Sequence, residues 1–227
     1  GSLCSAEAIG CLRAEAPGFE ALSSGPGYFI ASFEENAVEP IADRISLTRH
    51  IGRHLGSFSP SDLSGIGRIR IPEGTFSVRC RRFEGMMKNI DSQDLVRKIG
   101  KELSRTNDVK LKDPDIEVRV LMSDMIHVFL SQRAVDRESL ENRKVSERPF
   151  FSPISLHPKY ARALINLTGA RKGDLLLDPF CGTGGIVIEA ASMGIRAAAS
   201  DFDPEMIAGT RENMDFFNLD LEDSDVL

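Results

Sequence analysis

The amino-acid sequence predicts a chain in two parts, an α+β region followed by the beginning of an α/β domain with a parallel sheet. Two observations lead to this prediction. Between residues 76 and 133 the pattern runs strand, helix, strand, strand, which is typical of a small α+β unit. From residue 175 onward an apolar strand, a glycine turn and a helix follow one another, as they do where a parallel sheet begins.

Composition limits the class of protein. The chain has 227 residues, of which 41% are hydrophobic, so it can bury a core, and no apolar run approaches the length of a membrane span. The first residues lack the basic start and apolar block of a secretory signal. The four cysteines are scattered, with no C-x-x-C pair, which argues against a zinc site or a disulfide scaffold. These features favour a cytoplasmic protein with no membrane partner.

Turn signals and shifts in charge divide the chain into four segments. Residues 1–67 form an N-terminal segment, and residues 68–135 form the α+β unit. Residues 136–150 are a charged stretch, which we expect to be an exposed linker helix as far as Arg148. Residues 151–227 open the parallel α/β domain.

The elements expected within these segments follow from periodicity and capping residues. In the N-terminal segment they are a helix over 5–15, a strand over 28–33, a helix over about 40–55 and a loop over 57–67. In the α+β unit they are a strand over 75–83, a helix capped by Asp91, and strands over 116–122 and 125–133. In the α/β domain they are helices from 158, 186 and 205, and strands over 175–178 and 195–200.

The glycine turn at 178–185 is the most informative feature. Glycine lets the backbone approach a ligand closely, and the helix behind it offers unpaired N–H groups. The carboxylate of Asp178 would repel a pyrophosphate but suits a cationic or hydroxyl-bearing ligand, such as S-adenosylmethionine. Asp201 ends the next strand 23 residues later, where an acid can bind ribose hydroxyls. A dinucleotide fingerprint would need a third glycine, and Val187 occupies its place.

Two other candidate sites are weaker. Cys181 could be a nucleophile, but no histidine lies within ten residues, so packing in a crowded loop is the favoured interpretation. His50 and His54 have the spacing of metal ligands on a helix, but no third ligand supports them. The sequence therefore predicts no metal site.

Charge is unevenly distributed. Residues 76–150 carry 16 basic and 13 acidic groups, whereas the whole chain has a net charge of −6. A basic middle between acidic ends points weakly to a bound polyanion, and ordinary solvated charge is the alternative. The residues that could form a phosphate-binding face are Arg79, Arg81, Arg82, Lys88, Arg97, Lys98 and Lys101.

Together these residues support a family resemblance. The turn 178–185, with Leu156-His157-Pro158 and the helix before it, resembles motif I of the RNA guanine-N2 methyltransferases, and in particular of archaeal enzymes that modify guanine 10 of tRNA. The strand 76–83, the helix 95–103 and the following Asp113-Pro114-Asp115 resemble their THUMP domain, and the N-terminal segment resembles the ferredoxin-like part before it.

The resemblance implies a Rossmann-like methyltransferase domain after THUMP, with S-adenosylmethionine as cofactor and tRNA, held at its acceptor end by THUMP, as partner. The cofactor-binding residues that it implies are Asp178, Pro179, Cys181, Gly182, Thr183, Gly184, Gly185, Asp201 and Asp203.

One element of the family pattern is missing. Enzymes that methylate amines use an Asp/Asn-Pro-Pro-aromatic loop to hold the amine and the flipped base, and none of the 11 prolines here is adjacent to another. We therefore expect a truncated chain with no catalytic residues and no activity. Its incomplete sheet would expose strand edges, which predicts partial disorder, self-association or pairing with another chain.

Two alternatives stay open. A non-catalytic THUMP protein would bind tRNA without binding the cofactor. A DNA amino-methyltransferase would share the Asp-Pro-Phe-Cys-Gly-Thr-Gly turn, but would need a DNA-recognition domain where the THUMP-like unit lies.

Overall fold

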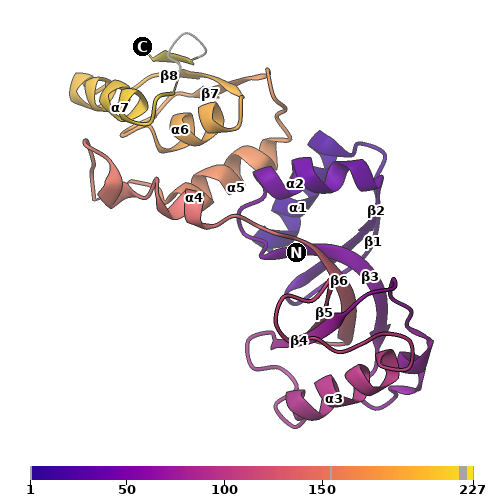
Figure 1. The fold of residues 1–227 in the computed structure, drawn as a ribbon. Coiled ribbons are helices and arrows are strands. Elements are labelled where there is room, and N and C mark those ends of the chain that lie inside the picture. The colour runs from indigo at the N-terminus through magenta and orange to yellow at the C-terminus, as the bar shows by residue number, and fades with distance from the viewer. Residues whose placement is uncertain (1, 154, 220–223, 227) are drawn as a thin grey trace. The chain divides into compact units, whose positions relative to one another are not determined.

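The computed structural model describes residues 2–153, 155–219 and 224–226, and the chain forms two compact units (Figure 1). The first unit contains Ala21–Ser32 and His50–Ala134. The second contains Leu3–Glu20, Phe33–Arg49 and the chain from Val135 onward. The chain therefore passes between the units more than once, and the predicted N-terminal segment 1–67 is shared between them.

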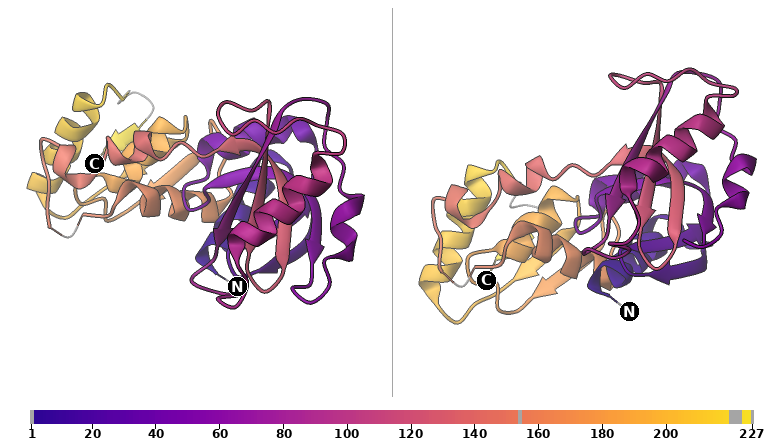
Figure 2. Two further views of the ribbon diagram at one scale, coloured as in Figure 1. Left: turned by 60° about the horizontal axis from the view of Figure 1, so that its bottom comes forward. Right: turned by 90° about the horizontal axis from the view of Figure 1, so that it is seen from below.

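The first unit is built on a four-stranded sheet with strand order β3-β6-β5-β4. Strands β4 and β5 are parallel and joined through helix α3, whereas β6 is antiparallel to both of its neighbours. Helix α3 lies on one face of this sheet, where its buried side chains join those of the strands in one apolar core (Figure 2). The elements are β1 (Glu20–Gly25), β2 (Tyr28–Ser32), β3 (His50–Phe58), η2 (Ser64–Arg68), β4 (Phe76–Arg82), α3 (Ser92–Leu103), β5 (Ile116–Met122) and β6 (Ile126–Ala134).

Helix α3 shows why this part could be predicted. The Asp91 side chain accepts hydrogen bonds from the backbone N–H groups of Gln93 and Asp94, and so caps the helix. Leu95, Ile99 and Leu103, at helical spacing, are each no more than 3% exposed. A local cap and one apolar stripe therefore suffice to define the element.

The predicted helix over about 40–55 is wrong. Helix α2 ends at Arg44, Ile45 is extended, and residues 50–58 form strand β3. The backbone N–H groups of Ser46 and Leu47 donate to the Glu7 carboxylate at 2.8 and 2.9 Å, which takes them out of a helical ladder. A Cβ atom at Gly52 would lie 2.1 Å from the Leu130 carbonyl oxygen, so this glycine permits the close approach of β3 to β6.

The second unit contains a parallel sheet of order β7-β8-β9. Its core joins α5 and α6 to β8 and α7 through residues such as Ile165, Val187, Ala197 and Met214. The elements are α1 (Leu3–Glu15), η1 (Glu35–Ala37), α2 (Val38–Arg44), α4 (Glu138–Glu141), η3 (Val145–Glu147), α5 (Pro158–Thr168), β7 (Leu175–Asp178), α6 (Gly185–Ser192), β8 (Arg196–Ala199), α7 (Pro204–Phe216) and β9 (Ser224–Val226).

The expected linker helix at 136–148 is also wrong. Only the short α4 and η3 form there, and Leu140 and Arg148 are 2% and 4% exposed. Arg143 forms an ion pair with the fully buried Glu189, at 2.8 Å. The charges of this stretch are therefore partly structural, which composition alone could not show.

Strand β9 was not predicted, because the acidic sequence near the end of the chain has no strand pattern. It pairs with β8, so β8 lies in the middle of the sheet and β7 keeps an unpaired edge among the described strands. Within the described residues, no helix combines the length and the apolar composition needed to cross a bilayer.

Candidate functional site

The glycine turn follows β7 and leads into α6, as the sequence predicted. Gly182 and Gly184 have φ angles of +53° and +79°, in the left-handed region that other residues rarely adopt. The Cys181 N–H donates to the Ser200 carbonyl oxygen, and the Ser200 N–H donates to that of Asp178, each at 3.0 Å. The turn is thereby attached to the end of β8.

Asp201 is bonded directly to the turn. One of its carboxylate oxygens accepts the Gly182 N–H at 2.9 Å, and the other accepts the Asp203 N–H at 3.1 Å. Asp203 in turn caps α7 by accepting the Glu205 N–H at 2.9 Å. Asp201 is thus held at the turn and keeps lone pairs for a further donor, whereas the Asp203 carboxylate serves as the cap of α7.

The two strand-end carboxylates differ in their electrostatics. Burial, together with the nearby charge of Asp201, raises the pKa of Asp178 above its ordinary value. Hydrogen bonds from the backbone of Asp203 and Gly182 hold the pKa of Asp201 below its ordinary value. Asp201 is therefore an ionised acceptor at neutral pH, and Asp178 is a partly desolvated acid that a cation would stabilise.

A cavity of about 220 Å³ lies beside the turn. Asp178, Phe180 and Gly182 line it, and Phe180 is 80% exposed. Phe202, which follows Asp201 in the sequence, is 93% exposed. Carboxylates and exposed aromatic rings around an open glycine backbone suit a ligand with hydroxyl groups, a cation and a flat ring. The remaining lining residues are Ser152, Ser155, Leu156, Cys181, Thr183, Gly185, Ile186 and Met206.

The other predicted residues of the turn have mainly structural contacts. Burial raises the pKa of the Cys181 thiol, which argues against a thiolate nucleophile. Thr183 is 4% exposed, and its hydroxyl lies 2.7 Å from that of Ser155. The carbonyl oxygen of Pro179 accepts a hydrogen bond from the Ser200 hydroxyl.

Helix α7 supplies residues that sequence reasoning missed. The Thr210 hydroxyl donates to the Gly182 carbonyl oxygen at 2.8 Å, and the Asn213 amide donates to that of Thr183 at 3.0 Å. Asn213 also bonds both the N–H and the carbonyl oxygen of Phe150. Their only signal in the sequence is that both are polar on a helix beyond the second strand.

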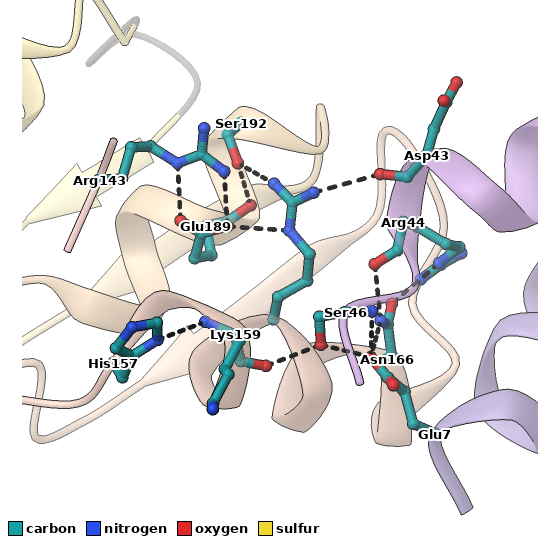
Figure 3. Close-up of polar contacts among 11 residues, drawn as sticks. Glu7, Asp43, Arg44, Ser46, Arg143, His157, Lys159, Asn166, Glu189 and Ser192 are labelled. Atoms are coloured by element: carbon teal, nitrogen blue, oxygen red, sulfur yellow. Dashed lines mark hydrogen bonds and ion pairs between the residues drawn. The ribbon is translucent and has the colours of Figure 1, made fainter. Parts of the chain in front are cut away.

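A second missed residue is Glu189, on the buried face of α6. Its carboxylate accepts from the guanidinium groups of Arg143 and Arg162 at 2.8 and 2.9 Å, as Figure 3 shows for Arg143. In the same view Asn166 of α5 contacts Glu7 and the Arg44 backbone, each at 2.9 Å. These buried polar contacts hold α1, α2 and α6 against α5, and thereby fix the helix that carries the turn.

The predicted phosphate-binding residues do not share one face of the first unit. By strand alternation Arg79 and Arg81 lie on the sheet face opposite α3, whereas Lys98 and Lys101 are exposed on α3. Arg82 donates to the carbonyl oxygens of Met86, Met87 and Ile90, which is a structural role.

Two of these cations have acidic partners. Arg79 lies 3.9 Å from Glu117, and Arg97 is ion-paired with Asp94. Lys88 sits in the turn that follows β4.

The two histidines with metal-ligand spacing, His50 and His54, do not lie on a helix. His54 lies on β3 rather than on a helix, and its Nε2 atom is 3.0 Å from the Ser57 hydroxyl. No group of three or more potential metal ligands occurs among the described residues.

Two family models match the chain. The THUMP domain matches residues 68–128, and the RMKL-like methyltransferase domain matches residues 146–222. The first match covers β4, α3, β5 and the start of β6, and the second covers the part of the second unit that carries the glycine turn. The chain therefore contains a THUMP domain followed by a methyltransferase domain, which confirms the predicted fold class.

The relatives are more specific. The chain is 34% identical over 224 residues to the tRNA (guanine(10)-N2)-dimethyltransferase of Methanothermobacter thermautotrophicus, covering 96% of the chain and 66% of the relative. It is 33% identical over 185 residues to the enzyme of the same name from Pyrococcus abyssi, covering 79% and 55%. The chain thus spans at most about two thirds of the length of these two relatives.

Among solved structures, the crystal structure of TrmN from Thermus thermophilus matches with a TM-score of 0.55 at 24% identity, covering 98% of the chain and 69% of that protein. This likeness concerns the fold. The two relatives named above are tRNA guanine-N2 methyltransferases, so the chain is similar to this class of enzyme over nearly its whole length.

Proposed function

We propose that the protein is an S-adenosylmethionine-dependent tRNA methyltransferase that acts on the exocyclic N2 of guanine, with the THUMP region holding the tRNA acceptor end. The observation that carries the proposal is the glycine turn 178–185, bonded through the Gly182 N–H to the carboxylate of Asp201. The names of the two relatives support the substrate, and guanine 10 is the position that both names give.

The residues present fit the cofactor. Asp201, ionised and still able to accept, would bind the ribose hydroxyls, and the adjacent exposed ring of Phe202 would contact the adenine. Asp178 would face the cationic end, because its carboxylate lines the cavity. Gly182, with no atom within 4 Å of the position of a Cβ, leaves the turn open to the ligand.

The bound cofactor would supply an electrophilic methyl group on its sulfonium. The exocyclic amine of the guanine would accept this methyl group from the sulfonium and would give up a proton. The contribution of this chain is alignment: Thr210 and Asn213 fix the carbonyl oxygens of the turn, and the buried contacts of Glu189 fix α6 behind it.

These 227 residues contain no Asp/Asn-Pro-Pro-aromatic segment. We propose that the chain alone binds cofactor and tRNA but does not transfer the methyl group. Incubation with cofactor labelled on the methyl group and a tRNA transcript should leave the RNA unlabelled, and robust labelling of guanine would contradict this part of the proposal.

For RNA contact we propose α3 of the THUMP region. Lys98 and Lys101 are exposed there and no acidic partner neutralises them among the described contacts, whereas Arg79 on the opposite face lies near Glu117. The double variant Lys98→Glu/Lys101→Glu should weaken tRNA binding by at least tenfold and flatten its salt dependence.

Arg79→Glu/Arg81→Glu is the matched control, with the same change of charge on the other face. It should weaken binding much less. A larger loss of tRNA binding in this control than in the α3 variant would indicate that the RNA binds the face opposite α3.

A further inference from the structure

The second unit contains a buried cation whose terminal nitrogens have no acceptor. Arg148, between η3 and the cavity segment, is 4% exposed. Its Nε–H donates to the Arg143 carbonyl oxygen at 3.2 Å, but Nη1 and Nη2 are buried without a hydrogen-bond partner among the described residues. Burying a guanidinium group without hydrogen-bond acceptors costs free energy, so the lack of an acceptor for these two nitrogens calls for an explanation.

Glu189, the carboxylate whose charge acts on Arg148, already has hydrogen-bond partners. Glu189 accepts from Arg143 with both oxygens, at 2.8 and 3.1 Å, and from Arg162 at 2.9 Å. Two guanidinium groups thus bind this buried carboxylate, and Arg148 is a third buried cation under the influence of its charge, which leaves an excess of positive charge. Burial lowers the pKa of Arg148, and the charge of Glu189 partly opposes this effect. The cluster is therefore suited to one more anion.

Arg148 lies immediately behind the wall of the cavity. Its Nη1 is 3.7 Å from the point that a Cβ of residue 185 would occupy, and the Leu156 carbonyl oxygen is 3.5 Å from the same point. Gly185 and Leu156 both line the cavity. Because residue 185 is glycine, no side chain there separates the guanidinium from the cavity.

The position of Arg148 is also fixed from both sides. Its N–H donates to the Val145 carbonyl oxygen in η3, and the backbone of Phe150 is bonded twice to Asn213 of α7. A residue held in this way is preorganised for a ligand.

We propose that Arg148 binds the carboxylate of the amino-acid end of the cofactor, an inference that rests on the proposed function. The cavity has the carboxylate of Asp178 on its wall and the guanidinium of Arg148 behind Gly185. This pairing matches a zwitterion, with its ammonium group toward the acid and its carboxylate toward the arginine. A phosphate would also suit Arg148, but Asp178 and Asp201 would repel it from the same cavity.

The test compares two ligands that differ only in the carboxylate, S-adenosylhomocysteine and S-adenosyl-3-thiopropylamine. Calorimetric titration of the chain should show that the first binds at least tenfold more tightly. In Arg148→Met this preference should fall below threefold. A purely structural role would weaken both ligands by the same factor and leave the preference intact, which would overturn the proposal.

Gly185→Ala provides a second, independent variant in case Arg148→Met does not fold. The added methyl group meets its neighbours at 3.5 to 3.8 Å, ordinary contact distances, so the fold should persist. It would stand between Arg148 and the cavity and should also reduce the preference for the carboxylate. An unchanged preference in this variant would count against the proposal.

The same titration separates the role of Arg148 from the proposed function. A wild-type chain that binds both ligands equally would retain the proposed function and overturn the role of Arg148. A wild-type chain that binds neither ligand would overturn both.

Discussion

An alanine at position 184 should destabilise the second unit, by an amount that follows from the backbone φ angle of Gly184 and from its contact with Thr210. Its φ of +79° costs an alanine roughly 1–2 kcal/mol. A Cβ there would also lie 2.8 Å from the Thr210 Cγ2 and 3.1 Å from its Oγ1. Moving Thr210 would strain its hydrogen bond to Gly182, worth about 1 kcal/mol. Gly184→Ala should therefore lower the free energy of unfolding of the second unit by about 3 kcal/mol.

Gly182→Ala is the matched control. Its φ of +53° carries a similar backbone cost, but no atom lies within 4 Å of its Cβ position, so the loss should be only about 1–2 kcal/mol. In Gly184→Ala/Thr210→Ser the offending methyl group is gone and the hydroxyl remains, so part of the loss should be recovered. Urea unfolding followed by circular dichroism gives the three values. Equal losses in the two alanine variants would refute the reasoning.

Glu189→Gln leaves the buried guanidinium groups uncompensated and should destabilise the second unit by about 3–5 kcal/mol in urea unfolding; a loss below 1 kcal/mol would contradict the burial argument. Desolvation lowers the pKa of the buried His127 and of the more exposed His54, so the unfolded first unit takes up protons more readily. Stability that is present above about pH 6.5 should therefore be lost as the pH falls below it. Thermal unfolding at pH 7.5 and 5.5 should show this loss, reduced in His127→Asn, and a stability that rises toward pH 5.5 would be the contrary result. Leu175 and Leu177 are 61% and 69% exposed at the unpaired edge of β7, so sedimentation velocity should show self-association that Leu177→Lys weakens, whereas a monomer at all concentrations would exclude it.

The cofactor turn could be predicted because its signals are local. An apolar strand, glycines with positive φ and the start of a helix lie within a few residues of one another. Asp201 can be predicted as well, because it lies just beyond the end of the next strand. Helix α3 is similar, since the Asp91 cap and one apolar stripe define it.

The misread segments depend on partners far away in the sequence. Ser46 leaves the helical pattern because its N–H bonds to Glu7, 39 residues earlier. A glutamate on a helix is usually exposed, but Glu189 is fully buried and forms ion pairs with Arg143 and Arg162. The prediction of a phosphate-binding face rests on charge alone, but Arg79 lies on the face of β4 opposite α3 and Lys98 lies on α3 itself. Hydrophobic periodicity does not show which charged side chains form ion pairs with one another.

The most direct test of the account is calorimetric titration of the chain with S-adenosylhomocysteine. We expect one binding site, and binding weakened at least tenfold in Asp201→Asn. The NH2 group of the asparagine would replace one of the two carboxylate oxygens that accept the Gly182 and Asp203 N–H groups. Asp174→Asn removes the same charge at the opposite end of β7, where Asp174 bonds the Arg171 N–H, and should bind as the wild type does. Saturable binding that depends on Asp201 and not on Asp174 is the predicted result. No binding by the wild type, or equal binding by both variants, would contradict the cofactor site.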